Sequence, residues 1–376
     1  MSNTENPCSL YIGLMSGTSM DGIDAALVRL DDKNCETIAA ASYAYPSELR
    51  EALINSSRKP GETTIDTLGK LDHWVGTCFR DAATSLLDAS GTASSRVRAI
   101  GSHGQTIRHC PHSDRPFTLQ IGDPNIIASG TGITTVADFR RRDLAAGGEG
   151  APLTPAFHQW LFADEKDARV VLNIGGIANI TVLPKGGGDV TGFDTGPGNV
   201  LLDAWTQQEQ DRPFDDGGAW ARSGEVLPDL LSRMLQDAYF SMAPPKSTGF
   251  EYFNIDWLEG YAGGRSFSAT DIQTTLLALT VQSIGDAVSQ YAAGSQEILV
   301  CGGGVHNIAL MDGLSRLALS VKWSSTSDHG LDPDYVEATA FAWLARQTIL
   351  GQPGNLPSVT GARQPEILGG IYVCAA

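Results

Sequence analysis

Hydrophobic and polar residues fall into distinct blocks along residues 11–30, the stretch around which the rest of the chain is organised. Two apolar runs, 11–15 and 23–30, flank a tip of small and hydroxylated residues at 16–22. Apolar runs of this length around a glycine-containing tip predict a strand, a turn and a second strand. The second run alternates only loosely, which indicates a strand that is buried on both faces.

The remainder of the first half predicts short strands and three helices. Strands are expected at 39–45, 97–100, 117–122 and 134–137. Apolar residues recur at helical spacing over 63–90 and predict a long helix there. Two shorter helices are expected at 47–56, after Pro46, and at 123–130. The strand at 97–100 runs into the small and polar residues 101–106, and α/β sheets present binding sites at such strand ends.

The second half of the chain repeats the pattern of two apolar runs around a glycine-containing tip. Residues 168–183 again form an apolar run, a tip containing Gly175 and Gly176, and a second apolar run, which makes them a weak repeat of residues 11–30. Thr270 and Gln273 resemble a capping box at the start of a helix that continues to Val288. Other elements of this half are expected as strands at 190–193, 297–301 and 367–373, and as helices at 200–205 and 335–350.

Composition and charge narrow the class of protein. A chain of 376 residues with 42% hydrophobic residues predicts a globular protein of about two to three domains. Its net charge of −17 and its lack of a basic run argue against a nucleic-acid partner. The six cysteines lack a framework spacing, as expected of thiols in a reducing compartment. Neither a signal peptide nor an apolar membrane span is apparent, so we expect a cytoplasmic protein without a membrane partner.

The tip at 16–22 is the first candidate for chemistry. Gly17 and Gly22 let the backbone approach a ligand closely. Successive N–H groups of such a turn, with the Ser16, Thr18 and Ser19 hydroxyls, can form a cradle for an anion. Asp21 would repel a bare phosphate but could hold a magnesium ion beside one. On these residues alone, an ordinary glycine-rich hairpin remains the alternative.

Asp194 is the second candidate. It follows the apolar run 190–193 and precedes two glycines and a predicted helix, whose first N–H groups favour anions. A carboxylate at this position is either a cap or turn residue or a catalytic group. The three glycines 302–304 follow a predicted buried strand, and they form either a tight turn or bare backbone for a ligand.

Three consecutive arginines between two acidic residues, at 138–143, are the third candidate. They form either a solvated surface turn or an anion-binding corner at a hinge. The glycine-rich residues after them, 147–150, favour a domain boundary here. Residues 109–112 contain two histidines and a cysteine, but the intervening proline and the short spacing make a metal site there a poor prediction.

Common nucleotide and nucleophile motifs are missing. The sequence contains no G-x-x-x-x-G-K-[ST], no G-x-G-x-x-G, no G-x-S-x-G and no H-E-x-x-H. It contains instead two strand–glycine–strand hairpins and one strand–glycine–helix turn. Two such hairpin tips that face each other, with a glycine-rich turn at the base, would hold a nucleoside triphosphate from both sides.

These features resemble the actin/hexokinase/heat-shock-chaperone superfamily and, within it, the 1,6-anhydro-N-acetylmuramic acid kinase family. The likeness extends from about residue 11 to the C-terminus. The motifs that carry it are GLMSGTSMDGID at 13–24, IGSHGQTIRH at 100–109, ADFRRRD at 137–143, LNIGGIANI at 172–180, GFDTGPGN at 192–199, PKSTG at 245–249 and VCGGG at 300–304.

The resemblance implies a two-domain α/β fold of actin/hexokinase-like (ribonuclease-H-like) type with a central nucleotide and sugar cleft. It implies a first lobe of residues 1–137 and 352–376 and a second lobe of 138–351. It further implies a homodimeric cytoplasmic kinase of cell-wall recycling. With ATP and Mg²⁺ this enzyme would open the anhydro ring and form N-acetylmuramic acid 6-phosphate and ADP.

The resemblance also implies roles for individual residues. Asp194 would be the general base, and Asp21 would hold Mg²⁺. The sugar would contact Thr106, Arg140, Arg141 and Glu337. The nucleotide would contact Ser16, Gly17, Thr18, Ser19, Met20, Asp21, Gly22, Ile23, Gly175, Gly176, Gly302, Gly303 and Gly304.

Two other functions fit parts of the pattern. A kinase of an ordinary hexose or amino sugar would share the fold and the catalytic aspartate. A nucleotide-driven module such as a chaperone ATPase would share the nucleotide hairpins, but no long polar linker or separate peptide-binding domain follows them. Only substrate tests distinguish the two kinases.

Overall fold

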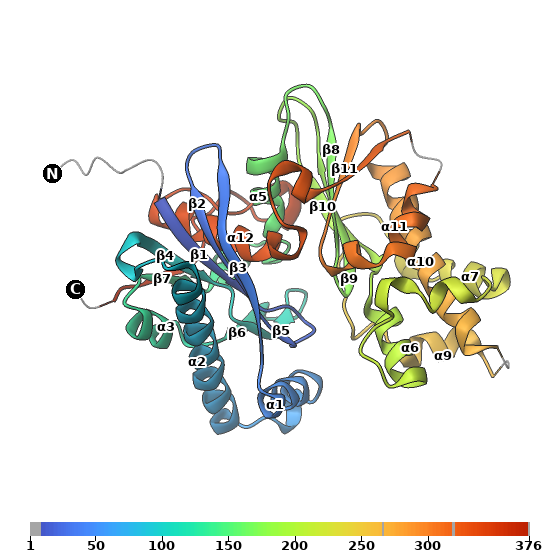
Figure 1. Ribbon diagram of the computed structural model, residues 1–376, viewed down its shortest axis with the longest axis horizontal. Helices are drawn as coiled ribbons and strands as arrows, with labels where there is room; N and C mark the ends of the chain where they lie inside the picture. Colours follow the sequence, from blue (N-terminus) through green and yellow to red (C-terminus); the bar gives the residue numbers. More distant parts are fainter. Residues whose placement is uncertain (1–8, 265–266, 318–319, 375–376) are drawn as a thin grey trace. The chain divides into compact units, whose positions relative to one another are not determined.

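The computed structural model describes residues 9–264, 267–317 and 320–374, whose contacts form two compact units (Figure 1). Unit 1 comprises Met1–Leu161 and Tyr335–Ala376, and unit 2 comprises Phe162–Asp334. The divisions therefore fall at 161/162 and 334/335, whereas the sequence suggested 137/138 and 351/352. The helix that follows Tyr335 causes the second difference, because it packs on the sheet of unit 1.

Unit 1 is built on a six-stranded sheet in the order β13-β7-β4-β1-β2-β3. Strands β1, β2 and β3 are antiparallel neighbours, whereas β4 is parallel to β1 and β7 is parallel to β4. The bounds are β1 (Ser9–Met15), β2 (Gly22–Leu30), β3 (Cys35–Ala44), β4 (Val97–Ser102), β7 (Thr135–Ala137) and β13 (Gly370–Tyr372). The hairpin predicted at residues 11–30 is confirmed.

Helices cover both faces of this sheet. Along β1, Ile12 and Leu14 point into one hydrophobic core, and Gly13 faces the opposite side. A Cβ atom on Gly13 would lie 1.7 Å from the carbonyl oxygen of Ala338 in α12 (Val336–Ile349), so glycine is what lets this helix lie against the strand.

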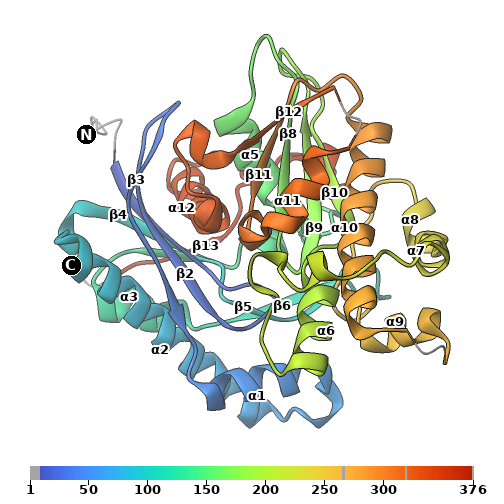
Figure 2. The same ribbon diagram turned by 45° about the vertical axis from the view of Figure 1, so that its right-hand side comes forward.

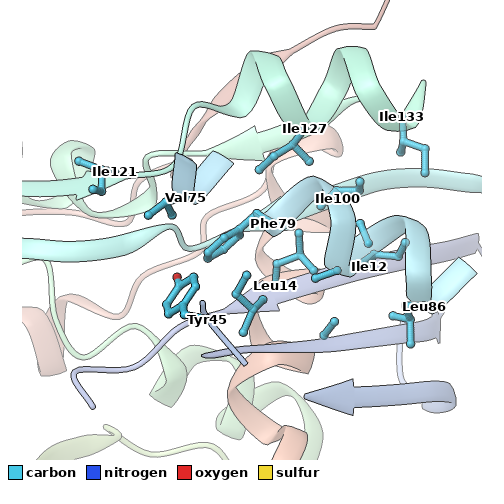
Figure 3. Close-up of a cluster of buried hydrophobic side chains, with 14 of the residues drawn as sticks. Ile12, Leu14, Tyr45, Val75, Phe79, Leu86, Ile100, Ile121, Ile127 and Ile133 are labelled. Atoms are coloured by element: carbon cyan, nitrogen blue, oxygen red, sulfur yellow. The ribbon is translucent and has the colours of Figure 1, made fainter. Parts of the chain in front are cut away.

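The core on the other face contains Ile12, Val75, Phe79 and Ile100, which are fully buried between the strands and α2 (Figure 3). Helix α2 (Ile65–Ser90) confirms the long helix predicted at 63–90, and it begins where the Thr64 hydroxyl accepts the Thr67 N–H. The other helices of unit 1 are α1 (Ser47–Arg58), α3 (Pro124–Thr131), α4 (Phe139–Ala145), α5 (Thr154–Phe162) and α13 (Pro357–Thr360).

Two parts of unit 1 differ from the sequence prediction. The small and polar stretch expected at 101–106 ends in a strand that was not predicted, β5 (Gln105–Cys110), which pairs with β6 (Phe117–Ile121) in a separate two-stranded sheet. The strand was missed because most of its side chains are polar. A hairpin with one face open to solvent needs few apolar residues. The arginine run at 138–143 is mostly the short helix α4 rather than a turn.

Unit 2 is built on a five-stranded sheet in the order β10-β9-β8-β11-β12. Strands β8, β9 and β10 are antiparallel neighbours, and β11 and β12 continue the sheet in parallel with β8. The bounds are β8 (Arg169–Ile174), β9 (Ile177–Leu183), β10 (Thr191–Pro197), β11 (Glu297–Cys301) and β12 (Lys322–Ser325).

Helix α10 (Ala269–Tyr291) runs beside this sheet (Figure 2) and contributes Ile284 and Val288 to its core. The N-cap of this helix is Ser268, whose hydroxyl accepts the Asp271 N–H. The capping box expected at Thr270 and Gln273 was therefore wrong, because the helix is capped two residues earlier. The other helices of unit 2 are α6 (Val200–Gln210), α7 (Pro228–Leu235), α8 (Ala238–Ser241), α9 (Ile255–Ala262) and α11 (Ile308–Ser315).

The two sheets share a five-strand topology, in which two parallel strands lie beside the first strand of a three-stranded antiparallel meander, and unit 1 adds β13, which is antiparallel to β7. The repeat inferred between residues 11–30 and 168–183 is therefore confirmed, because these segments are β1–β2 in unit 1 and β8–β9 in unit 2. A duplicated sheet of this order is the one expected of an actin/hexokinase-like protein, and the predicted α/β fold class is confirmed.

Candidate active site

The connection between β1 and β2 carries the residues predicted to bind phosphate. Met20 adopts a left-handed conformation with φ of 54°, and its buried side chain anchors the turn. Its N–H donates to the Gly17 carbonyl over 3.3 Å. Thr18 and Ser19 are exposed at the tip, and Ile23 is buried where β2 begins. The tip therefore offers hydroxyl groups to solvent on a turn that the core holds in place.

Asp21 is exposed on the same turn. Its Oδ1 accepts a hydrogen bond of 2.8 Å from the Ser19 hydroxyl. Among the described residues, no group of three or more acidic, histidine or cysteine side chains is arranged to hold a metal ion. Magnesium needs no such group, because one carboxylate, water and phosphate oxygens satisfy it in many kinases. Asp21 thus fits a magnesium ion that arrives with a nucleotide.

The turn is fixed by hydrogen bonds to the side chains of Gln105 and His103. Neither residue was predicted as a site residue from the sequence. The Ser16 hydroxyl lies 2.7 Å from Gln105 Oε1 and 2.6 Å from the Gly22 carbonyl oxygen, so two acceptors share its proton. Gln105 Nε2 donates to the Gly17 carbonyl over 3.1 Å. His103 Nδ1 lies 3.2 Å from the Ser16 carbonyl oxygen.

Arg140 and Glu337 come together in unit 1. Burial raises the pKa of Glu337 above its usual value, the Asp24 carboxylate adds to this, and the Arg140 guanidinium opposes it. Arg140 donates to His103 Nε2 over 2.9–3.1 Å and to the Gly150 carbonyl over 2.8 Å. The structure therefore places one cation and one carboxyl group of the predicted sugar site in electrostatic contact.

The other two predicted sugar ligands differ from each other. Thr106 lies on β5, where its hydroxyl oxygen accepts a 3.1 Å hydrogen bond from Gln120. That contact leaves the Thr106 proton available to a ligand. Arg141 instead points to the surface and forms a 3.0 Å ion pair with Asp138. In this arrangement the Arg141 side chain pairs with Asp138, whereas Arg140 contacts His103 and Gly150.

In unit 2, Asp194 lies within β10 and not beyond its end, at the bulge where the pairing with β9 shifts register. Its Oδ2 accepts the Thr248 N–H over 3.0 Å. The residue is half-buried. Burial, and to a smaller extent the Glu251 carboxylate, raises the pKa of Asp194, the Thr248 N–H and Lys246 oppose the rise, and the resulting pKa is about 7. A carboxylate with this pKa can accept a proton near neutral pH.

The loop at 245–249 and Tyr239 surround this carboxylate. Lys246 is buried, with Nζ 3.2 Å from the Tyr239 carbonyl oxygen and 4.7 Å from the centre of the Tyr239 ring. The Tyr239 hydroxyl donates to the Asp194 carbonyl over 2.7 Å. The Thr248 hydroxyl is buried without a hydrogen-bond partner among the described residues, which suits a bound water or substrate. No sequence pattern near these residues connects them to Asp194, which lies about fifty positions away.

Around the start of the helix that follows Asp194, three successive backbone N–H groups are bound within the chain. The N–H groups of Gly198 and Val200 donate to the Gly176 carbonyl over 2.9 and 3.0 Å, and the Asn199 N–H donates to the Gly175 carbonyl over 2.9 Å. The start of α6 thus fixes the β8–β9 tip, and these N–H groups are already used.

The glycines of the three predicted nucleotide turns fall into two kinds. A Cβ atom on Gly302 would lie 2.3 Å from Asn173 Oδ1, and one on Gly304 would lie 2.4 Å from Ile174 Cγ2, so packing within the chain explains both. By contrast, a Cβ atom on Gly303 would meet nothing within 4 Å.

Gly17, Gly175 and Gly176 resemble Gly303. The nearest atoms to a Cβ on each of them would be 3.7–3.9 Å away, at ordinary contact distance, and none has a positive φ. The chain itself does not require glycine at these positions. The open space suits a ligand, so the turns fit the phosphates and the nucleoside of a nucleotide.

The fold has a carboxylate with a pKa near neutral pH, and its turns leave open space for a nucleotide. These two features are expected of a phosphotransferase. The chain is an enzyme of this class within the actin/hexokinase-like fold. Among its described helices, none is long and apolar enough to cross a membrane.

Comparison with known sequences defines the family. Residues 9–374 match the family described as anhydro-N-acetylmuramic acid kinase. The protein of that name from Xanthomonas campestris is 51% identical over 373 residues, covering 98% of both chains. That from Vibrio cholerae is 52% identical over 365 residues, covering 96% of this chain and 98% of the relative. The chain belongs to the anhydro-N-acetylmuramic acid kinase family, and membership implies the use of ATP.

Proposed function

We propose that the enzyme hydrolyses the 1,6-anhydro ring of anhydro-N-acetylmuramic acid and phosphorylates the released 6-oxygen. The products are N-acetylmuramic acid 6-phosphate and ADP, which places the enzyme in the recycling of peptidoglycan fragments. Water adds its oxygen to the anomeric carbon as the bond from that carbon to the 6-oxygen breaks. The 6-oxygen takes the γ-phosphoryl group of ATP, and the proton of the water passes to Asp194.

The observation that carries this proposal is the raised pKa of Asp194, at about 7, in a half-buried position. Near pH 8 the group is mostly ionised, yet it binds a proton far more strongly than an exposed aspartate. The Thr248 N–H fixes Oδ2, so the carboxylate keeps one orientation toward an attacking water. A general base of this kind contributes about 10²–10⁴-fold to the rate.

A single essential carboxylate suffices for this reaction. Most glycosidases use a second carboxylic acid to protonate the leaving oxygen. In the proposed reaction the leaving oxygen is phosphorylated instead, so the phosphoryl group takes the place of that proton. The raised pKa of Asp194 fits the single base that this chemistry needs.

The turn between β1 and β2 and the glycines of unit 2 are proposed to bind the nucleotide. Ser16–Ile23 would contact the β- and γ-phosphates, and Gly175, Gly176 and Gly303 would lie against phosphate and adenosine. Asp21 would hold magnesium, which neutralises phosphate charge when bound. Support comes from the exposed hydroxyls of the turn and from the space above these glycines.

Arg140, Glu337 and Thr106 are proposed to bind the sugar. Arg140 offers N–H donors to an acidic or carbonyl oxygen, the protonated or ionised Glu337 carboxyl can bind a hydroxyl, and the Thr106 proton is available to an acceptor. Arg141 would join them only if its ion pair with Asp138 opened.

We further propose that the enzyme acts in the cytoplasm as a homodimer, as the family resemblance implies.

A coupled assay of ADP release tests the function. The wild type should turn over 1,6-anhydro-N-acetylmuramic acid and ignore glucose and N-acetylglucosamine. Asp194→Asn should reduce kcat by about 10²-fold or more, because the amide cannot take the proton. Phosphorylation of a plain hexose without use of the anhydro sugar would exclude the proposed substrate, and an active Asp194→Asn enzyme would exclude Asp194 as the base.

A further inference from the structure

His103 lies between the phosphate turn and the guanidinium of Arg140. It directly follows β4, and its ring is buried against Phe341 of α12, with ring centres 4.8 Å apart. Its backbone N–H donates to the Leu14 carbonyl over 2.9 Å, which fixes the residue to β1. The side chain therefore has little freedom, and both of its ring nitrogens meet partners.

The partners determine which nitrogen carries the proton. Arg140 directs two donors, Nε and Nη2, at His103 Nε2 over 3.1 and 2.9 Å. Because an arginine has no acceptor, Nε2 must be the unprotonated nitrogen. The proton is then on Nδ1, which lies 3.2 Å from the Ser16 carbonyl oxygen and donates to it.

Burial and the neighbouring Arg140 cation both lower the pKa of His103 well below its usual value. The ring consequently stays neutral at physiological pH, and the lone pair on Nε2 remains available to Arg140. A protonated ring would place two cations against each other and break the contact. The neutral ring is thus a rigid link with one donor and one acceptor.

Arg140 is held from a second side as well. Its Nη1 donates to the Gly150 carbonyl over 2.8 Å. The buried Asp143 carboxylate fixes Gly150, because it accepts the Gly150 N–H over 2.7 Å and also hydrogen bonds from Asn355 and Thr360 over 2.6 and 2.7 Å. These contacts restrain the guanidinium between two fixed acceptors.

The contacts of Arg140 leave part of its guanidinium unused. Of the five N–H groups that an arginine carries, three are taken by His103 and Gly150. The other two have no hydrogen-bond partner in the part of the chain that the structure describes. They belong to Nη1 and Nη2, and they keep a fixed direction because the other three are bound.

We propose that His103 is a positioning residue that fixes the Arg140 guanidinium, relative to the phosphate turn, for binding of the sugar. The inference rests on the proposed function, in which Arg140 contacts the sugar and the turn contacts ATP. His103 itself touches neither ligand in this proposal. It transmits the position of the Ser16 backbone to Arg140 through one rigid ring.

Two conservative substitutions separate the two contacts of the ring. The amide of asparagine lies at about the position of Nδ1, so His103→Asn can keep the donor to Ser16 but has no acceptor within reach of Arg140. The longer glutamine places its amide oxygen near the position of Nε2, so His103→Gln can keep the acceptor for Arg140. Loss of a hydrogen bond to a charged group corresponds to about tenfold or more in binding.

The experiment measures KM for the anhydro sugar and for ATP in wild type, His103→Asn and His103→Gln. KM does not depend on the fraction of enzyme that is folded, so partial unfolding does not obscure the result. We expect His103→Asn to raise the sugar KM about tenfold or more and His103→Gln to raise it by less than about threefold. Equal effects of the two variants would overturn the proposal.

A double-mutant cycle with Arg140→Ala provides the decisive comparison. If His103 acts through Arg140, His103→Asn should change the sugar KM by less than about twofold in the Arg140→Ala enzyme. An undiminished effect, or an Arg140→Ala enzyme with an unchanged sugar KM, would overturn the inference. Failure of the wild type to use the anhydro sugar would instead contradict the proposed function, so the two failures are distinguishable.

His158 offers a matched control. It is another buried histidine of unit 1, on α5, and burial lowers its pKa to about 3. His158→Asn removes the same ring from a different place in unit 1, where it lies beside Phe157 with ring centres 6.2 Å apart. It should leave the sugar KM unchanged, and a rise equal to that of His103→Asn would show a general effect of losing a buried imidazole.

Discussion

Thr248 donates its backbone N–H to Oδ2 of Asp194 over 3.0 Å, although fifty-three residues lie between them in the sequence. The same loop also accepts the Asp194 backbone N–H through the Lys246 carbonyl oxygen, over 3.2 Å. Asp194 is therefore held by main chain at its backbone and at its carboxylate. Side-chain substitutions in the loop should change the charge around Asp194 and leave this contact in place.

The pH dependence of kcat/KM should show an acid limb with an apparent pKa near 7. Burial raises the pKa of Asp194 to about 7, and the protonated acid cannot act as the base. Below this pKa the rate should fall roughly tenfold for each pH unit. A pH–rate profile with saturating ATP measures this, and a flat profile between pH 5.5 and 8 would contradict the role of Asp194.

Two charge variants should move this limb in opposite directions. Lys246 lowers the pKa of Asp194 and the Glu251 carboxylate raises it. Removal of the cation in Lys246→Met should therefore shift the acid limb to higher pH, and Glu251→Gln should shift it to lower pH. Shifts in the same direction, or an unchanged limb in both enzymes, would show that another group controls the profile.

Much of this fold could be predicted from local pattern. The apolar runs around a polar tip identified both hairpins, and helical spacing identified α2, because burial of one face or of both faces leaves a direct periodic signal. Strand β5 was not predicted, since its exposed face is polar and gives no run of apolar residues. The unit boundary after Asp334 was not predicted either. Only the packing of α12 against Gly13 and Gly101 shows that this helix is part of unit 1.

The candidate site could be predicted only in part. Asp194 and the glycine turns have local signatures, since a carboxylate or a glycine cluster at a strand end is visible in the sequence. Thr248, Lys246 and His103 gain their roles from contacts with residues that are distant in the chain. No spacing rule connects His103 with Arg140, so the structure was needed to pair them.

Gly303 and Gly302 should respond differently to alanine. At Gly303 a Cβ atom would meet nothing within 4 Å, so Gly303→Ala should leave the melting temperature unchanged and raise the KM for ATP several-fold by occupying the space of the nucleotide. The sugar KM should stay constant. An unchanged KM for ATP would show that the nucleotide does not lie against this glycine.

Gly302→Ala serves as the comparison for this prediction. Gly302 has φ of 80°, and its added Cβ atom would lie 2.3 Å from Asn173 Oδ1. The strained backbone and the clash should reduce the free energy of unfolding by about 1–3 kcal/mol. Thermal unfolding of both variants measures the difference, and equal melting temperatures would contradict the distinction between the two glycines.

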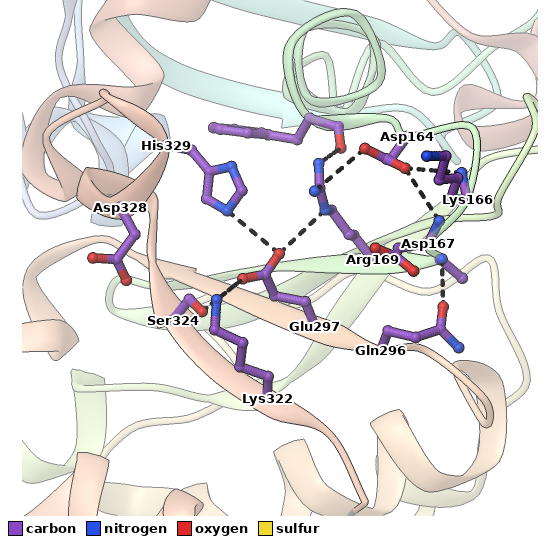
Figure 4. Close-up of polar contacts among 12 residues, drawn as sticks. Asp164, Lys166, Asp167, Arg169, Gln296, Glu297, Lys322, Ser324, Asp328 and His329 are labelled. Carbon is purple, nitrogen blue, oxygen red and sulfur yellow. Dashed lines mark hydrogen bonds and ion pairs between the residues drawn. The ribbon is translucent and has the colours of Figure 1, made fainter.

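Glu297 should control the acid stability of unit 2. This buried residue begins β11, and its carboxylate contacts Lys322 Nζ and Ser324 Oγ at 2.7 Å, Arg169 Nε at 3.2 Å and His329 Nε2 at 3.3 Å (Figure 4). Burial by itself would raise the pKa of Glu297, but the hydrogen bonds from Lys322, Ser324 and His329 outweigh burial and lower the pKa to about 2.

The sign of the effect follows from this lowered pKa. The unfolded chain binds a proton at Glu297 near pH 4.5, whereas the folded protein does so only near pH 2. The contacts therefore stabilise the fold fully above pH 4.5, and the stabilisation is lost as the pH falls toward 2. Glu297→Gln should reduce the free energy of unfolding at pH 7 by about 2–4 kcal/mol, because it removes the buried anion that Arg169, Lys322 and His329 share and leaves Arg169 only its longer ion pair with Asp164.

Urea unfolding of wild type and Glu297→Gln at several pH values measures this difference, which should shrink between pH 4.5 and 2. The network lies at the start of β8 and β11, and the glycine turns follow the ends of the same strands, so KM values at pH 7 should not change. Glu36→Gln is a suitable control, because its ion pair with Arg29 is exposed and should contribute less than about 1 kcal/mol. A difference between wild type and Glu297→Gln that is independent of pH would assign the stabilisation to packing and not to the charge of Glu297.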